Sequence, residues 1–343
     1  MNVHTRCRRW TCLPITAALF AATLAGCSGG TGGRGTITLY NGQHPQLTQK
    51  IVAAFEKQTG IHVKLLSNDG VVLADQLLQE GTASPADVYL TENSPELMLL
   101  EQHHLLATLP ASTLSQIPAR YSSPAGDWVG VALRVSALVY NPSLISPAAL
   151  PATIDDLSES RFKGKLAVAP SDSDFVPLVG ALLATDGSAL TKQWLKGLLA
   201  NGSFYQDDEA VVAAVNRGSE AIGIINQYYW YRLRLELGAS HMHSALYFFP
   251  NHDVGSIENI SGVAVLAASH HKVDAERFVS FLVSAVGQRI ISSSDDFEYP
   301  ARDGIKPNPA LEPLATIQPD TLDVIRLGND RPAAALLQEL GLT

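Results

Sequence analysis

Apolar positions along the chain follow two alternating patterns. In one, they recur at helical spacing, as for Leu47, Ile51 and Phe55, which share one face of a segment that ends at Gly60. In the other, short runs of consecutive apolar residues are typical of strands buried on both faces. Strands are therefore predicted at 36–42, 61–67, 86–92, 128–141, 163–171, 220–226 and 261–269. Helices are predicted at 46–60, 71–81, 93–106, 174–185, 191–202, 209–218 and 272–291.

This alternation of strands and helices predicts an α/β protein with a mostly parallel sheet whose faces are covered by helices. In such sheets, ligands bind beyond the carboxyl ends of the strands. His44, Glu92 and the pair Tyr228 and Tyr229 each follow a predicted strand end. These four potential metal donors are therefore all predicted to lie just beyond the carboxyl end of a strand, where ligands bind.

The first 26 residues have the pattern of an export signal. Arg6, Arg8 and Arg9 precede an apolar stretch at 13–25 that is too short to span a membrane. The "LAGC" that ends at Cys27 resembles the lipobox of bacterial lipoproteins, which implies cleavage before Cys27 and lipidation of that cysteine. The alternative is an N-terminal helix that is not cleaved. Residues 27–35, rich in glycine, are expected to form a flexible tether.

Composition limits what the exported chain can do. Removing 26 of the 343 residues leaves 317, enough for two domains of ordinary size. Cys27 is then the only remaining cysteine, so neither an internal disulfide nor a thiolate metal site is possible. The leader carries three basic residues and no acidic ones, so the net charge changes from −9 to −12. An acidic exported protein is not expected to bind nucleic acid and is compatible with a cationic ligand.

The stretch "INQYYWYRL" at 225–233 places two tyrosines side by side after an apolar run. On a helix such neighbours are about 100° apart, so packing alone gives little reason to pair them. They are either half-buried aromatics at an element boundary or two phenols that converge on a ligand. Taken singly, His44 could equally be a surface residue and Glu92 a helix cap.

Several segments, in order, resemble the ferric-ion-binding proteins of bacterial ABC importers. They are "ITLYNGQH", "FEKQTGIHV", "PADVYLTEN", "GDWVGV", "RFKGKLAVAPS", "INQYYWYRL", "SGVAVL" and "EYPARDGI". The resemblance implies a two-lobed type II periplasmic binding protein fold, with crossover strands and a cleft between the lobes. One lobe would comprise 36–134 with 259–309, and the other 135–258 with 310–343. It also implies a monomer that delivers its ion to a membrane permease with a cytoplasmic ATPase.

The resemblance further implies a set of Fe³⁺ ligands. The family's histidine falls on His44, its carboxylate on Glu92 and its two tyrosines on Tyr228 and Tyr229. Arg134 matches an arginine that lies near the cleft in relatives. Fe³⁺ is a hard cation that prefers anionic oxygen donors, and two phenolates with one carboxylate match its three positive charges.

In relatives an exogenous anion, commonly phosphate or carbonate, completes the coordination at a turn of small residues. Here that turn reads Asp172-Ser173-Asp174, and Asp208 replaces an expected asparagine. Carboxylates repel such an anion, so an aspartate could instead serve as a ligand. Amide contacts are expected from Asn93 and Asn226.

Two other classes of function compete. The same fold could bind an organic solute such as thiamine, a polyamine or a phosphonate, with the tyrosines as an aromatic wall. A secreted hydrolase is disfavoured, because the chain has no GxSxG elbow and no evident Ser/His/Asp set. The remaining histidine groups and acidic runs are expected to be surface features or helix starts; they are His103-His104, His241-Met242-His243, His270-His271, Asp207-Asp208-Glu209 and Asp295-Asp296.

Overall fold

All seven predicted strands, and four that were not predicted, are present in the computed structural model, which describes residues 35–342. They are β1 (Thr36–Gly42), β2 (His62–Ser67), β3 (Val88–Thr91), β4 (Leu106–Ala107), β5 (Trp128–Tyr140), β6 (Leu166–Val168), β7 (Gly202–Phe204), β8 (Ile222–Asn226), β9 (Ala245–Tyr247), β10 (Glu258–Leu266) and β11 (Tyr299–Pro300). Short strands such as β4, β7, β9 and β11 lack the long apolar run that would have revealed them.

All seven predicted helical segments contain helix, and within residues 35–342 the structure adds five helices that were not predicted. They are α1 (Pro45–Thr59), α2 (Gly70–Glu80), α3 (Ser94–Gln102), α4 (Ala111–Leu114), α5 (Phe175–Thr185), α6 (Gly187–Asn201), α7 (Asp208–Arg217), α8 (Gln227–Leu237), α9 (Lys272–Val283), α10 (Ala285–Ser292), α11 (Leu314–Ile317), α12 (Val324–Leu327) and α13 (Arg331–Glu339). Local chemistry explains their ends. Pro45 occupies the first turn of α1, and Gly60 ends that helix in the left-handed region at φ 73°.

Two predicted helices end earlier than their apolar pattern indicates. The segment 93–106 is helical only to Gln102, because His104 adopts a left-handed conformation at φ 56° before β4 begins. The segment 272–291 is interrupted at Ser284, whose hydroxyl accepts a hydrogen bond from the amide of Gly287 and caps α10. Apolar periodicity runs through both interruptions and so could not show them.

The sheet is mixed, and the expectation of a mostly parallel sheet was wrong. Its strand order is β2-β1-β3-β10-β5-β8-β6-β7, with β4, β9 and β11 paired to strands of this path. The pairs β1–β2, β1–β3, β6–β7 and β6–β8 are parallel. The central pairs β3–β10, β10–β5 and β5–β8 are antiparallel. A parallel α/β unit therefore lies at each end of the strand order, joined by antiparallel strands.

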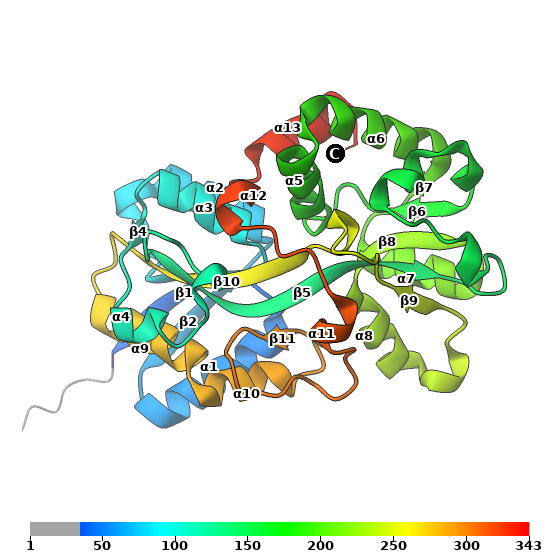
Figure 1. Cartoon of the computed structure of the whole chain (residues 1–343). Coiled ribbons are helices and arrows are strands. Elements are labelled where there is room, and N and C mark those ends of the chain that lie inside the picture. The colour runs from blue at the N-terminus through cyan, green and yellow to red at the C-terminus, as the bar shows by residue number, and fades with distance from the viewer. Residues whose placement is uncertain (1–34, 343) are drawn as a thin grey trace, which may run out of the picture. The chain divides into compact units, whose positions relative to one another are not determined.

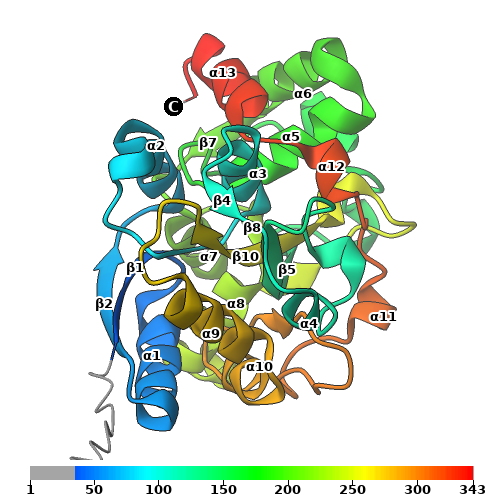
Figure 2. The same cartoon turned by 90° about the vertical axis from the view of Figure 1, so that its left-hand side faces the viewer.

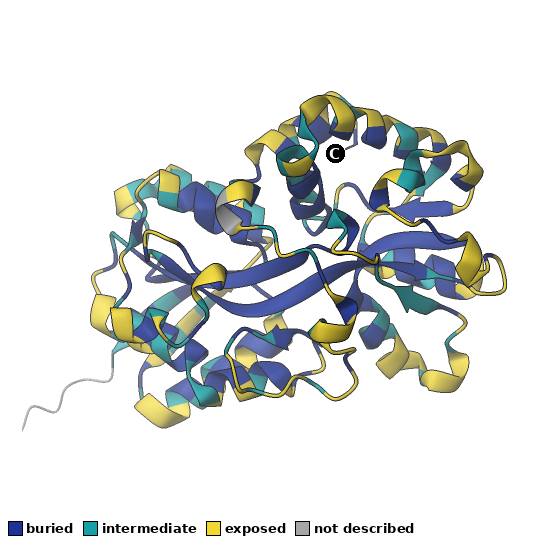
Figure 3. Ribbon diagram, in the orientation of Figure 1, coloured by how far each residue is buried: buried dark blue, intermediate teal, exposed yellow. Residues whose placement is uncertain are grey.

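Strands β5 and β10 form the connection between these two units (Figure 1). The first half of β5 pairs with β10 and β11, and its second half pairs with β8 and β9. Nearly every residue of both strands is buried (Figure 3). Arg134 lies midway along β5, opposite Asn259. A charged residue thus sits at the point where the two halves of the sheet meet.

Two hydrophobic cores pack against the sheet, and the larger one extends from its first half to Val211 of α7 and Ile225 of β8 in its second half. One includes Leu39, Phe55 and Trp128, with α1 and α9 packed beside the strands. The other includes Leu182 and Trp194, on α5 and α6. Figure 2, turned by 90°, shows α1 and α9 beside β1 and α5 beside α13. Within residues 35–342, no helix is both long and apolar enough to cross a membrane.

Candidate metal site

His44 lies at the junction between β1 and α1. It occupies the N-cap position without forming a side-chain cap, and its amide donates a hydrogen bond to Gln43 Oε1 at 2.7 Å. Its side chain is 11% exposed, so it is not the surface residue that a histidine after a turn often is. Nε2 lies 3.3 Å from Glu92 Oε1. Nδ1 is buried and has no hydrogen-bond partner among the described residues.

Glu92 and Asn93 follow β3, and their roles differ. The carboxylate of Glu92 faces His44, and its Oε2 lies 3.9 Å from Arg134 Nη2. Asn93 is buried, and its Oδ1 accepts hydrogen bonds from Arg134 Nη2 at 2.6 Å and from Asn259 Nδ2 at 2.8 Å. Asn93 therefore orients Arg134, whereas Glu92 presents its carboxylate to the cleft.

Tyr228 and Tyr229 occupy the first turn of α8, directly after β8. Their ring centroids are 4.1 Å apart with an interplanar angle of 30°, and the Tyr228 ring lies edge-on to His44 at 5.0 Å. Both hydroxyls donate to the same atom, Asp174 Oδ2, at 2.7 and 3.1 Å respectively. The two phenols therefore converge on one carboxylate oxygen.

Asp174 precedes α5 and joins the tyrosines to Arg134. Its Oδ1 lies 3.0 Å from Arg134 Nη2, and its Oδ2 accepts the two phenol hydrogen bonds. Arg134 is completely buried and also lies 3.5 Å from Glu298 Oε1. Three carboxylates, those of Glu92, Asp174 and Glu298, thus surround this one guanidinium.

Asp172 and Asp208 accept hydrogen bonds from three backbone amides in and near the Asp172-Ser173-Asp174 turn. Asp172 accepts from the amide of Asp174 through Oδ1 and from that of Asp208 through Oδ2, both at 3.0 Å. Asp208 accepts from the amide of Asn226 at 3.0 Å. Ser173 lines the cleft cavity. The amides that could cradle an anion are therefore already bonded to carboxylates of the chain itself.

One buried amide group in this region has no partner. Nδ2 of Asn226 forms no hydrogen bond among the described residues, although its Oδ1 accepts from Ser136 Oγ at 3.3 Å. Arg134 Nε is a second buried donor without a partner, but Arg134 contacts the ionised carboxylate of Asp174, which opposes the binding of an anion such as phosphate or carbonate.

Burial dominates the protonation states of the donors. It raises the pKa of Tyr228 and of Tyr229 well above 10, and the charge of Asp174 adds to the shift. It raises the pKa of Glu92 to about 8, against the opposing effect of Arg134. Burial lowers the pKa of His44. Without a cation, the donors are therefore held mostly in their neutral forms near pH 7.

The aspartates respond differently. Burial alone would raise the pKa of Asp174, but the Arg134 charge and the Tyr228 hydrogen bond outweigh it and lower that pKa. Burial raises the pKa of Asp172 to about 7 and that of Asp208 well above its ordinary value. Asp174 is thus the aspartate of the turn that stays ionised, and it is the one that contacts both phenols.

Three of the four candidate donors border a cavity of about 480 Å³, whereas Tyr228 is fully buried behind it. His44, Glu92 and Tyr229 line it, and Arg232 lies at its edge beside Glu209, at 3.5 Å. The Arg232 guanidinium lies about 6 Å from the centres of both tyrosine rings. The cavity is therefore lined by mixed charges rather than by the apolar surface of a typical organic-ligand pocket.

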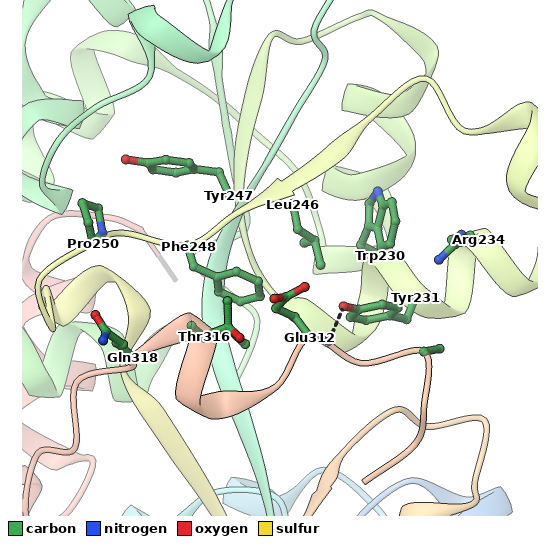
Figure 4. Close-up of a pocket in the computed structure, with 12 residues that line it drawn as sticks. Trp230, Tyr231, Arg234, Leu246, Tyr247, Phe248, Pro250, Glu312, Thr316 and Gln318 are labelled. Atoms are coloured by element: carbon green, nitrogen blue, oxygen red, sulfur yellow. Dashed lines mark hydrogen bonds between the residues drawn. The ribbon is translucent and has the colours of Figure 1, made fainter.

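A second cavity, of about 550 Å³, lies on another side of α8 (Figure 4). Trp230, Tyr231 and Phe248 line it, and the hydroxyl of Tyr231 accepts a hydrogen bond from the amide of Glu312 at 3.1 Å. Trp230 and Tyr231 therefore line a different cavity from Tyr229. Volume does not distinguish the two cavities, but only the smaller one has the convergent donors.

Sequence reasoning missed three polar residues behind the site. Gln43 Nε2 donates to both carboxylate oxygens of Glu298, at 3.3 and 3.2 Å, and Glu298 is completely buried. Asp296 Oδ1 lies 3.4 Å from His44 Nδ1. We expected the Asp295-Asp296 pair to be solvated, which was wrong for Asp296: it is 7% exposed. The sequence did not indicate that the two aspartates differ, because only tertiary packing buries Asp296 and leaves Asp295 exposed.

The other histidine groups behave as expected. His103, His104, His241, His243 and His270 are exposed. Across the described part of the chain, no cluster of three or more His, Cys, Asp and Glu side chains is arranged to hold a metal. The candidate site differs from such a cluster in that two of its four donors are phenols.

The family of the chain follows from comparison with known proteins. A model of the family described as bacterial extracellular solute-binding protein matches residues 83–321. The chain therefore belongs to this family, whose members bind solutes and are not enzymes.

Two relatives are named as ferric-iron-binding proteins. The Fe(3+)-binding periplasmic protein of Serratia marcescens is 39% identical over 306 residues, which cover 89% of this chain and 90% of that protein. The major ferric iron-binding protein of Neisseria meningitidis serogroup B is 33% identical over 329 residues, which cover 95% and 99%. The predicted resemblance to ferric-ion-binding proteins is confirmed.

Solved structures agree with the predicted type II periplasmic binding protein fold. Iron-bound HitA from Pseudomonas aeruginosa matches with a TM-score of 0.85 and 38% identity, over 90% of this chain and all of that one. Apo ferric ion-binding protein A from Pasteurella haemolytica matches with a TM-score of 0.79 and 27% identity, over 90% and 98%. The fold is thus shared with both an iron-bound and an iron-free relative.

Proposed function

We propose that this protein captures Fe³⁺ in the cleft through His44, Glu92, Tyr228 and Tyr229, and delivers it to an ABC importer. The observation that carries the proposal is that both phenol hydroxyls converge on Asp174 Oδ2 while His44 lies 3.3 Å from Glu92 beside them. Hard anionic oxygen donors and one imidazole in a single cleft suit a small trivalent cation.

Charge balance supports the proposal. Ionising a free tyrosine at pH 7 costs roughly 4 kcal/mol, because its pKa of about 10 lies three units higher at 1.36 kcal/mol each. Burial makes this harder for Tyr228 and Tyr229, whose pKa values are raised further. Only a highly charged cation placed between the two oxygens reverses that preference. The site therefore discriminates against weakly charged solutes.

Asp174 supplies the negative charge that an exogenous anion provides in relatives. It stays ionised through its contact with Arg134, and it already touches both phenols. Two phenolates, Glu92 and Asp174 carry four negative charges, which Fe³⁺ and the Arg134 guanidinium balance. We therefore propose that iron binding here needs neither phosphate nor carbonate.

Anchoring and delivery rest on parts of the chain that the structure does not describe. The signal peptide at 1–26, the lipidated Cys27 and most of the tether at 27–35 lie outside the described residues. In this proposal the lipid holds a monomer at the membrane face. The lobes at 36–134 with 259–309 and at 135–258 with 310–343 close around iron and present it to the permease. These boundaries and the lipid anchor remain predictions.

The proposal is tested by replacing phenols on one helix. Wild-type protein with Fe³⁺ is expected to show a visible phenolate-to-iron charge-transfer band, and the double variant Tyr228→Phe with Tyr229→Phe is expected to lose it. Tyr231→Phe is the matched control, because Tyr231 lies on the same helix but contacts Glu312 instead of the cleft. A band that persists in the double variant refutes the ligand assignment.

An organic solute is the alternative, and the cavity of about 480 Å³ would admit one. The same purified protein distinguishes the two in a thermal-shift panel of Fe³⁺, thiamine, a polyamine and a phosphonate. Stabilisation by Fe³⁺ supports our proposal. Stabilisation by one of the organic solutes, with none by Fe³⁺, supports the alternative.

A further inference from the structure

The three-residue segment Asp296-Phe297-Glu298 lies behind the candidate site and contacts several of its parts. Asp296 follows α10, is buried, and its amide donates to Ser294 Oγ at 3.3 Å. Its Oδ1 lies 3.4 Å from Nδ1 of His44. That nitrogen is buried and has no hydrogen-bond partner in the described chain, so the Asp296 carboxylate faces an unsatisfied polar atom.

Phe297 fixes the position of this segment. Its φ of 53° places a bulky residue in the left-handed region, which costs energy and persists only where the surroundings impose it. Its ring stacks on Tyr231 of α8 at 5.5 Å, and its carbonyl accepts a hydrogen bond from Gln227 Nε2 at 3.1 Å. The segment is therefore anchored to the helix that carries Tyr228 and Tyr229.

Glu298 ties the same segment to the backbone of His44. Its carboxylate accepts from Gln43 Nε2, and Gln43 Oε1 accepts from the amide of His44 at 2.7 Å. The backbone of His44 is thus held by Gln43 and Glu298. The orientation of its ring depends on what lies at the two ring nitrogens.

We propose that Asp296 is a positioning residue for His44, accepting the Nδ1 hydrogen so that Nε2 faces the metal. The proposal rests on the proposed function, because it needs His44 to be a ligand. A neutral imidazole carries its proton on one nitrogen and a lone pair on the other. Nε2 lies toward Glu92 and Nδ1 toward Asp296, so the proton belongs on the Asp296 side. Metal-bound histidines commonly have such a carboxylate partner.

A double-mutant cycle on Fe³⁺ affinity tests the proposal. Asp296→Ala is expected to weaken Fe³⁺ binding about 10- to 100-fold, the usual cost of losing such a partner. In a His44→Ala background the same change is expected to alter affinity by no more than about twofold, because it acts through a ring that is no longer there. Affinity is measured by competition with a chelator, following the phenolate band. Asp295→Ala, the exposed neighbour, is the matched control and is expected to bind as wild type.

Nitrogen hyperfine coupling in pulsed EPR of the Fe³⁺ form gives a second readout. The imidazole coupling is expected to change in Asp296→Ala and in Asp296→Asn, and to stay as in wild type in Asp295→Ala. Asp296→Asn keeps the shape and an acceptor oxygen, so it is expected to fold and to lose less affinity than Asp296→Ala. This second variant keeps the proposal testable should the alanine variant not fold.

Three results would overturn the positioning role. They are an Asp296→Ala affinity equal to wild type, an equal loss in both backgrounds of the cycle, and an unchanged nitrogen coupling in Asp296→Asn. An equal loss in both backgrounds would mean that Asp296 acts by general electrostatics or on the fold. A wild-type protein without a phenolate band would instead refute the proposed function, so the two failures are distinguishable.

Discussion

Asp174 Oδ1 lies 3.0 Å from Nη2 of Arg134, and both side chains are buried at the point where the two halves of the sheet meet. Because one carboxylate oxygen is occupied by Arg134, the other is free to face Tyr228 and Tyr229. The buried arginine thus sets both the charge of Asp174 and its orientation toward the phenols.

Removing Arg134 should destabilise the iron-free protein. Arg134→Met leaves the buried carboxylates of Asp174 and Glu298 without their partner, and breaking such a buried pair costs about 3–5 kcal/mol. Denaturant unfolding of the iron-free form measures this loss. Adding Asp174→Asn to Arg134→Met should restore part of it, whereas Arg277→Met, at a 61% exposed side chain, should change little. Equal stability of Arg134→Met and wild type would contradict the assigned charge network.

Removing the charge of Asp174 should create a need for an exogenous anion. Asp174→Asn keeps the shape but loses the negative charge next to the phenols, so Fe³⁺ affinity should fall by roughly two to three orders of magnitude. Added phosphate or carbonate should recover part of that affinity, because the anion supplies the missing charge. Asp303→Asn, at an exposed position, is the control. Should wild type itself require an added anion, the proposed role of Asp174 is wrong.

Iron binding should release protons. Near pH 7 both phenols and most of Glu92 are protonated in the iron-free protein, since burial raises the pKa of Glu92 to about 8 and those of the tyrosines well above 10. We therefore expect roughly two to three protons released per Fe³⁺, and an affinity that falls as the pH is lowered. The number of protons released is measured by titration calorimetry of Fe³⁺ binding in buffers of different ionisation enthalpy. Release of fewer than about one proton would exclude two phenolate ligands.

The sequence predicted most elements, because apolar periodicity reports burial. It did not predict strand direction: β5 and β10 have the same apolar pattern as the parallel strands but run antiparallel to their neighbours. It also missed the break at Ser284, since the apolar face continues from α9 into α10. Periodicity shows which side of a segment is buried and says nothing of hydrogen-bond partners.

The candidate donors were found through family resemblance, and the structure brings the four side chains close together, three of them at one cavity. The network behind them was not predictable. Gln43, Asp296 and Glu298 have no distinctive spacing, and the Asp295-Asp296 doublet has the composition of a solvated turn. Their roles depend on contacts between segments that are far apart in the chain. Gln43 and Glu298, for example, are hydrogen-bonded although they are 255 residues apart in the sequence.

The last prediction concerns the stability of the iron-free protein and the pH. Burial is the main cause that raises the pKa of Glu92 from its ordinary value of 4.5 to about 8 in the folded protein. Between these values the folded state binds more protons than the unfolded state, so the free energy of unfolding should decrease as the pH rises from about 5 to 8. Burial of Glu298 and Asp172, whose pKa values are each raised to about 7, adds to the same trend.

Urea unfolding of the iron-free protein at pH 5, 6, 7 and 8 measures this trend. Glu92→Gln, which cannot ionise, should flatten it, while Glu236→Gln, at an exposed position, should leave the slope unchanged. The iron-loaded protein should show the opposite dependence, since Fe³⁺ binds the deprotonated donors and its contribution grows with pH. An iron-free stability that rises with pH, or a slope equal in Glu92→Gln and wild type, would mean that Glu92 is not held neutral by burial.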